Sequence, residues 1–124
     1  MRSWADILVI VVTLSVPPAA GGVDIAGASS GSHQARLERG REIAFDRTKG
    51  NCLACHAIDG GTLPGNIGPP LMVMKQRFPE RERLRAQIRD ATASNPDSIM
   101  PPFGRHRILS DEEIELVVDF LYSL

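Results

Sequence analysis

The feature that most constrains this chain is the run Cys52-Leu53-Ala54-Cys55-His56, which contains the only two cysteines of its 124 residues. A disulfide across so short a loop would stabilise the fold little, because it removes little entropy from the unfolded chain. Two thiols and a histidine on one turn of chain can instead bind one haem, through its two vinyl groups and its iron. The motif therefore predicts covalent haem c on Cys52 and Cys55, with His56 as an iron ligand.

Three other interpretations of the motif compete with haem attachment. A thioredoxin-like redox pair needs a βαβ context, and the sequence shows no strand pattern. A zinc site needs four ligands, so His33 or His106 would have to complete the set at irregular spacing. The motif could also occur by chance. An export signal and an all-helical pattern both favour the haem interpretation.

The amino-terminal stretch has the layout of a secretory signal peptide. Arg2 is its early cation, residues 7–16 are nearly all apolar, and small residues come next. We assign residues 1–28 to a signal peptide and flexible lead-in, cleaved after about residue 20 to 28, and residues 29–124 to one domain. The apolar run is shorter than the about 20 residues that span a bilayer, so we expect a periplasmic protein without a stable membrane span. An uncleaved amino-terminal anchor is the alternative.

Helical periodicity dominates the rest of the chain, so the predicted fold class is all-α. The first helix is expected over Ala35–Thr48, with Gly40 in its middle. A glycine there costs about 1 kcal/mol relative to alanine, which suggests that another backbone crosses closely. Pro79 is expected to open a second helix at its first position. The last helix should begin at a capping box of Ser110 and Glu113.

A methionine is the expected second axial ligand, and Met100 has the most suitable setting. It lies in a loop predicted over residues 94–104 and is followed by Pro101 and Pro102. The first proline disfavours a helical conformation at Met100, and the second stiffens the chain after it. Such a loop can present a weak thioether ligand at a fixed distance.

Other side chains compete for the same role. Met72 and Met74 come after a loop rich in glycine and proline, and we interpret both as apolar packing residues. His33 and His106 could ligate iron in principle, although isolated histidines more often lie on the surface or form hydrogen bonds.

Charge is nearly balanced, at −1 for the whole chain, which argues against a nucleic-acid partner. The charged residues are nonetheless segregated along the sequence. The basic segment is either a solvated helix face or a docking patch for a redox partner of complementary charge. Basic residues gather at Lys75, Arg77, Arg81, Arg83, Arg85 and Arg89, and acidic residues at Asp111, Glu112, Glu113, Glu115 and Asp119.

Four segments, in this order, resemble the SoxX family, the small cytochrome subunit of the thiosulfate-oxidising SoxAX complex of bacteria. The cysteine motif alone is typical of any class I cytochrome c, whereas the further segments single out SoxX. They are Gly50-Asn51-Cys52-Leu53-Ala54-Cys55-His56, Gly65-Asn66-Ile67-Gly68-Pro69-Pro70-Leu71, Met100-Pro101-Pro102-Phe103-Gly104 and Leu109-Ser110-Asp111-Glu112-Glu113-Ile114.

The resemblance implies a class I cytochrome c fold, in which the amino- and carboxy-terminal helices cross around one covalently bound haem. Gly40 and Phe45 of the first helix would pack against the last helix at Val118, Leu121 and Tyr122.

The resemblance also implies the haem-binding residues. His56 and Met100 would be the axial ligands, and Pro69 and Leu71 would lie beside the haem. The carbonyl of Pro69 would accept a hydrogen bond from His56 and so fix its ring and tautomer.

In function, the resemblance implies a subunit of a periplasmic heterodimer that acts as an L-cysteine S-thiosulfotransferase. SoxAX couples thiosulfate oxidatively to a cysteine of the carrier SoxY, and its catalytic haem belongs to SoxA. This chain would pass electrons from SoxA to a soluble acceptor cytochrome. It would not be catalytic alone, because no thiol remains once Cys52 and Cys55 are used.

Two other functions compete with the subunit role. The first is a free-standing periplasmic monohaem carrier between membrane complexes and a terminal oxidase. The second is a haem-based ligand sensor, which the proline-stiffened Met100 loop disfavours.

Overall fold

The computed structural model describes residues 25–124, so the expected signal peptide lies almost wholly outside the described residues. The described part is helical, and its only strand-like pairing is an isolated parallel bridge between Ile58 and Leu71. The all-α prediction is thereby confirmed. The elements are α1 (Ile25–Phe45), η1 (Cys52–Ala54), α2 (Met74–Arg77), α3 (Arg81–Arg89), η2 (Ala91–Ala93) and α4 (Asp111–Leu121).

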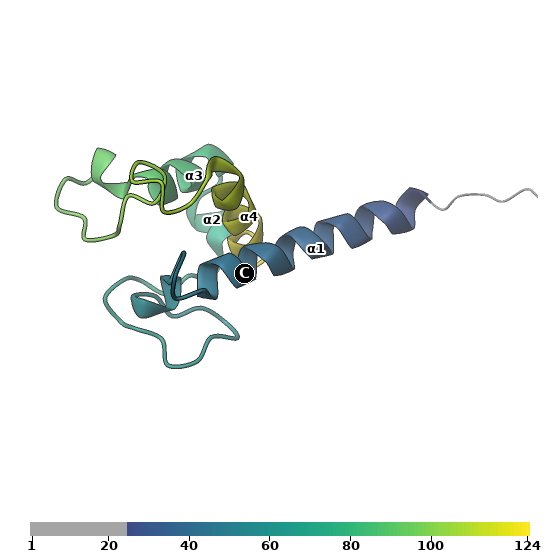
Figure 1. Ribbon diagram of the computed structural model, residues 1–124, viewed down its shortest axis with the longest axis horizontal. Coiled ribbons are helices and arrows are strands. Elements are labelled where there is room, and N and C mark those ends of the chain that lie inside the picture. The colour runs from purple at the N-terminus through teal and green to yellow at the C-terminus, as the bar shows by residue number, and fades with distance from the viewer. Residues whose placement is uncertain (1–24) are drawn as a thin grey trace, which may run out of the picture.

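Helix α1 is the longest element, and its amino-terminal part extends well beyond the rest of the domain (Figure 1). The predicted start of this helix at Ala35 was wrong, because the helix already begins at Ile25. Most of the expected lead-in lies outside the described residues. Glycine and serine lower helix propensity here, but no proline interrupts the segment. Within residues 25–124, no helix is both long and apolar enough to cross a bilayer.

Helices α1 and α4 cross at Gly40, as the sequence predicted. A Cβ atom on this buried glycine would lie 2.9 Å from the Cβ of Phe120 and closer still to the carbonyl oxygen of Leu116. Next to the crossing, the rings of Phe45 and Phe120 meet edge to face, with centroids 5.9 Å apart. The missing side chain of Gly40 therefore lets the two backbones approach.

The residues of α4 that meet Gly40 differ from the expected set. Val118 is fully buried in the core, Leu121 lines a cavity, and the Tyr122 hydroxyl donates a hydrogen bond to the Phe78 carbonyl over 2.7 Å. Neighbouring residues of a helix are rotated by about 100° about its axis. A small error in the orientation assumed for α4 therefore assigns its residues to the wrong face.

The basic and acidic clusters of the sequence pair with each other across α3 and α4. These ion pairs join Arg81 to Glu115 and Asp119, at 2.8 and 2.7 Å, Arg85 to Glu115 at 2.5 Å, and Arg89 to Asp111. Hydrogen bonds from Arg81 and Arg85 hold the pKa of Glu115 below its usual value. Much of the basic segment thus forms a contact between helices, which neither sequence interpretation anticipated.

The helix starts show one success and one error of sequence reasoning. The capping box of α4 is confirmed: the Ser110 hydroxyl accepts from the Glu113 amide over 3.1 Å, and the Glu113 carboxylate accepts from the Ser110 amide over 3.0 Å. Pro79 does not open a helix, because α3 begins at Arg81 and Glu80 is its N-cap. Pro79 instead lies in the connection between α2 and α3.

Replacing Gly40 by alanine should destabilise the protein by at least about 1–3 kcal/mol, since the added methyl group overlaps the α4 backbone. The matched control is Gly31→Ala in the same helix, where a Cβ would meet nothing within 4 Å. Chemical denaturation of both variants measures the difference. Equal stabilities would contradict the close crossing at Gly40.

Candidate haem-binding site

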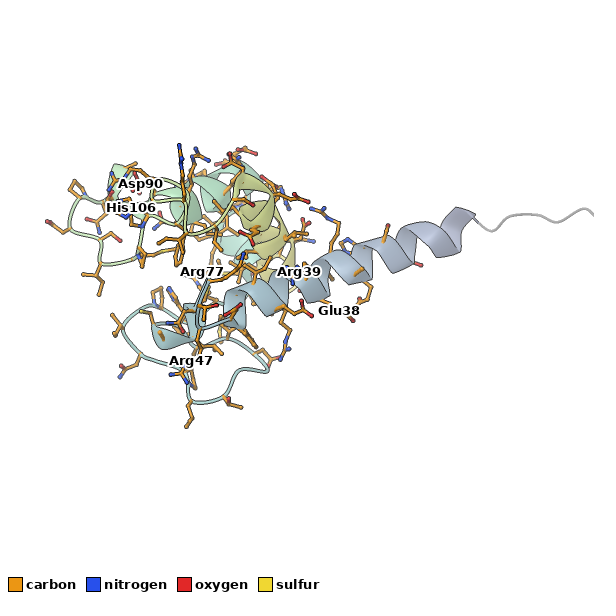
Figure 2. The ribbon with its side chains drawn as sticks, in the orientation of Figure 1. Glu38, Arg39, Arg47, Arg77, Asp90 and His106 are labelled. Carbon is orange, nitrogen blue, oxygen red and sulfur yellow. The ribbon has the colours of Figure 1, made fainter. Side chains whose placement is uncertain are left out.

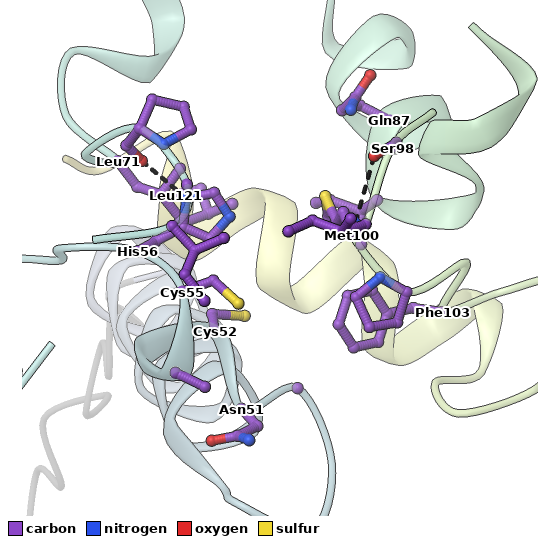
Figure 3. A pocket seen from close by; sticks show the side chains of 18 of the residues that line it. Asn51, Cys52, Cys55, His56, Leu71, Gln87, Ser98, Met100, Phe103 and Leu121 are labelled. Atoms are coloured by element: carbon purple, nitrogen blue, oxygen red, sulfur yellow. Dashed lines mark hydrogen bonds between the residues drawn. The ribbon is translucent and has the colours of Figure 1, made fainter. Parts of the chain in front are cut away.

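A cavity of about 640 Å³ opens between the loop that carries the cysteine motif and the loop that carries Met100 (Figure 3). Its lining is mostly apolar, and Leu121 of α4 and Phe103 belong to it. Protein interiors are otherwise close-packed with few voids, so a cavity of this size indicates a place for a bound group. The volume falls within the range of about 300–1,000 Å³ typical of cofactor sites.

The two cysteines occupy one wall of the cavity: Cys52 is the first residue of η1, and Cys55 is its C-cap. Their sulfur atoms lie next to each other and point into the cavity (Figure 3), and no disulfide joins them. Burial raises the pKa of the Cys52 thiol to about 11. Thioredoxin-like pairs work through a lowered pKa, so this environment argues against the redox-pair interpretation.

His56 is oriented by the loop after it. Its Nδ1 lies 2.7 Å from the carbonyl oxygen of Pro69, the contact that the family resemblance implies. A carbonyl can only accept, so Nδ1 carries the proton and Nε2 keeps its lone pair for a metal ion. A Cβ on Gly68 would fall 2.5 Å from Nδ1, so the ring lies directly against a residue without a side chain.

Two backbone hydrogen bonds hold this loop against the motif. The Gly68 amide donates to the Cys55 carbonyl and the Leu71 amide donates to the Ala57 carbonyl, each over 2.8 Å. Leu71 and Pro69 both line the cavity. Sequence reasoning missed the contact of Gly68 with the ring, although the Gly-Pro-Pro run was the available signal.

Met100 lies on the opposite wall, and its side chain points into the cavity across from His56 (Figure 3). The Met100 amide donates to the Ser98 hydroxyl over 3.3 Å, and the Phe103 amide donates to the Pro101 carbonyl over 2.9 Å. These local hydrogen bonds order the loop. The structure thus brings together Cys52, Cys55, His56, Pro69, Leu71 and Met100 around one cavity.

The competing ligands have other surroundings. Met74 is 1% exposed and belongs to the hydrophobic core, which confirms its packing role, while it also borders the cavity. Met72 is 59% exposed and lies outside the cavity lining, so its predicted packing role was wrong. His33 and His106 are both exposed and outside the lining. Residues 25–124 contain no group of three or more histidine, cysteine or acidic side chains suited to a metal ion.

The donor set fits haem c. Two adjacent thiols, a histidine with a free Nε2 and a facing thioether are the groups that attach and ligate a haem, and the apolar walls suit its macrocycle.

Comparisons with known proteins agree with this chemistry. Residues 35–121 match the family described as cytochrome c oxidase, cbb3-type, subunit III. The crystal structure of SoxXA from P. pantotrophus is similar, with a TM-score of 0.63 and 29% identity over 70% of this chain and 80% of that chain. An uncharacterized lipoprotein of Aquifex aeolicus (strain VF5) is 36% identical over 76 residues, 60% of this chain. The match spans only 37% of that relative's length.

Replacing Met100 by alanine should lower the reduction potential by on the order of 0.1 V and open the iron to added ligands, if Met100 is the second axial ligand. Met72→Ala is the matched control, since that side chain is 59% exposed and outside the cavity. Potentiometry and absorption spectra with added imidazole measure both effects. An unchanged spectrum in Met100→Ala would refute the assignment.

Proposed function

Because the chain belongs to the family of cytochrome c domains described as cytochrome c oxidase, cbb3-type, subunit III, we propose that it is a periplasmic electron-transfer protein. More specifically, we propose that it is the SoxX-like subunit of a SoxAX-type complex. The observation that carries the proposal is the cavity, because residues from three of the four segments that resemble SoxX line its facing walls. The similarity to the SoxXA crystal structure supports the same assignment.

The proposed roles of the residues follow from the cysteine motif and the resemblance, and the geometry of the cavity supports them. Cys52 and Cys55 would hold haem c covalently through their sulfur atoms, and His56 and Met100, which lie on facing walls of the cavity, would hold its iron. Haem c bound there supplies a one-electron redox couple. The Pro69 carbonyl keeps the proton on Nδ1 of His56, and the apolar lining excludes water. Methionine ligation favours a higher reduction potential than ligation by two histidines, which suits an electron acceptor.

The proposed subunit conducts electrons and does not carry out the sulfur chemistry alone. Its only two cysteines are committed to the haem, so a sulfur-bearing intermediate needs a thiol from another chain. In the proposal, a SoxA-like cytochrome supplies the catalytic haem and a SoxY-type carrier supplies the acceptor cysteine. Electrons then leave through this chain to a soluble cytochrome.

An apolar rim around the cavity mouth is the proposed contact with the partner subunit. Ile67, Ile99 and Ile108 line the cavity and are 62%, 76% and 38% exposed. Apolar side chains gathered at one exposed place are typical of protein interfaces. Two other apolar residues do not belong to this rim, because Phe103 is 7% exposed in the cavity wall and Leu63 lies outside the lining.

A free-standing carrier is the second candidate function. The description of the matching family names a terminal oxidase, which favours electron delivery to such an enzyme. A carrier would bind several partners weakly, whereas a subunit should bind one partner stably.

Pull-down of the tagged mature chain from the periplasm of thiosulfate-grown cells separates the two candidates. We expect a stoichiometric second cytochrome with a cysteine-ligated haem, identified by mass spectrometry and spectroscopy. Ile99→Asp should weaken its capture about tenfold or more, as loss of an interface anchor does. His33→Asp, on the exposed face of α1, should leave capture unchanged. A monomer without a stable partner would contradict the subunit role and favour the carrier.

A further inference from the structure

The turn of Pro69 and Pro70 beside His56 contains acceptors but no backbone donors, since proline has no N–H group. The Pro69 carbonyl lies 2.7 Å from Nδ1 of His56, and the Pro70 carbonyl accepts a hydrogen bond from Nη1 of Arg77 over 2.6 Å. We propose that Arg77 is the positioning residue of His56: it fixes this turn, and the turn orients the imidazole. The inference rests on iron ligation by His56, proposed above, and not on the identity of the partner.

Backbone contacts alone leave the turn incompletely held. The Gly68 and Leu71 amides bind the motif on either side of it, each over 2.8 Å. Between these two anchors the proline peptides can only accept hydrogen bonds, so any restraint on them from a side chain has to come from a donor. Arg77 is the side chain that donates to Pro70. Its guanidinium is planar and presents donors in a rigid fork, so the contact is directional.

Arg77 is well placed to act as an anchor. It ends the short helix α2, whose first residue, Met74, is 1% exposed in the core. The Nη1 atom of Arg77 also lies 3.6 Å from the Met74 sulfur. This arginine is exposed and borders the cavity; Figure 2 labels it apart from His106, which is also exposed but lies outside the lining. The turn is therefore tied to the core through α2.

The contacts of Arg77 distinguish it from the four arginines that follow it in the basic segment. Arg81, Arg85 and Arg89 pair with carboxylates of α4, and Arg83 lies 3.7 Å from Glu80. Within residues 25–124, Arg77 has no ion-pair partner, and the two acceptors of its side chain are the Pro70 carbonyl and the Met74 sulfur. Arg77 of the basic segment therefore contacts the turn beside the cavity and takes no part in the ion pairs between α3 and α4.

Loss of this donor should loosen the hydrogen bond between His56 and Pro69. In Arg77→Met the aliphatic stem remains, but the Pro70 carbonyl loses its partner and the turn gains freedom. Opening of the His56–Pro69 bond should become about tenfold more frequent, the factor that corresponds to one ordinary hydrogen bond.

Deuterium exchange of the His56 ring Nδ1–H, followed by NMR on the haem-loaded protein, measures this opening directly. We expect about tenfold faster exchange in Arg77→Met and exchange within about threefold of wild type in Arg77→Lys, which keeps a charged donor. Arg83→Met is the charge-matched control, because that side chain is 69% exposed and near one carboxylate only, and it should match wild type. Arg77→Gln, with one neutral amide donor, replaces Arg77→Met if the latter does not fold.

A reference for global opening comes from the amide of Val118, which is fully buried in α4. Equal acceleration at His56 and Val118, or an unchanged His56 rate in the variant without a charged donor, would overturn the positioning role. Arg77→Lys exchanging as fast as Arg77→Met would do so as well. The absorption spectrum of the wild-type protein is recorded before any variant is compared. Absence of bound haem in that spectrum would overturn the proposed function itself.

Discussion

The close contact of α1 and α4 at Gly40 is the constraint on which the rest of the structure depends. Helix α1 ends at Phe45, so its position determines where the cysteine motif begins its turn a few residues later. Helix α4 contributes Leu121 to the cavity. The crossing thus places the motif-bearing wall and the inner end of the cavity relative to each other. A side chain at Gly40 would push both apart through the overlap with Leu116.

The ion pairs between α3 and α4 help to position the cavity wall that carries Met100. Helix α3 carries arginines on the side that faces α4, and its far end leads through η2 into the Met100 loop. Partly exposed pairs contribute little individually, but here Glu115 binds two arginines and Asp119 binds Arg81 and Arg36 of α1. The ion pairs therefore connect three helices. A domain of about a hundred residues with few aromatic side chains has a thin core, and a haem in the cavity would add the missing apolar contact.

Sequence reasoning succeeded where the signal was local. The Ser110 capping box depends on two residues that are three positions apart. Gly40, as a glycine inside a helix, indicated that another backbone approaches closely there. The Gly-Pro-Pro run and the two prolines after Met100 indicated the two loops that face each other across the cavity. Errors arose where distant residues decide the outcome. The α3–α4 pairing was hidden, because charge patterns along one helix do not reveal which surface they meet.

Helix boundaries were predicted least well. Poor helix formers at the start of α1 suggested a flexible segment, yet the structure continues the helix through them. Pro79 can open a helix in general, but here it lies before the N-cap residue Glu80, since α2 ends only a few residues earlier. The role of Arg77 was out of reach of the sequence, because its partner is a backbone carbonyl brought close by the turn between α2 and the motif.

Peptide mapping by mass spectrometry of the protein isolated from its host cells tests the central claim most directly. We expect one peptide that carries Cys52 and Cys55 with a single haem bonded to both sulfur atoms. Unmodified thiols, or a disulfide between the two cysteines, would contradict the haem site around which the two walls are arranged.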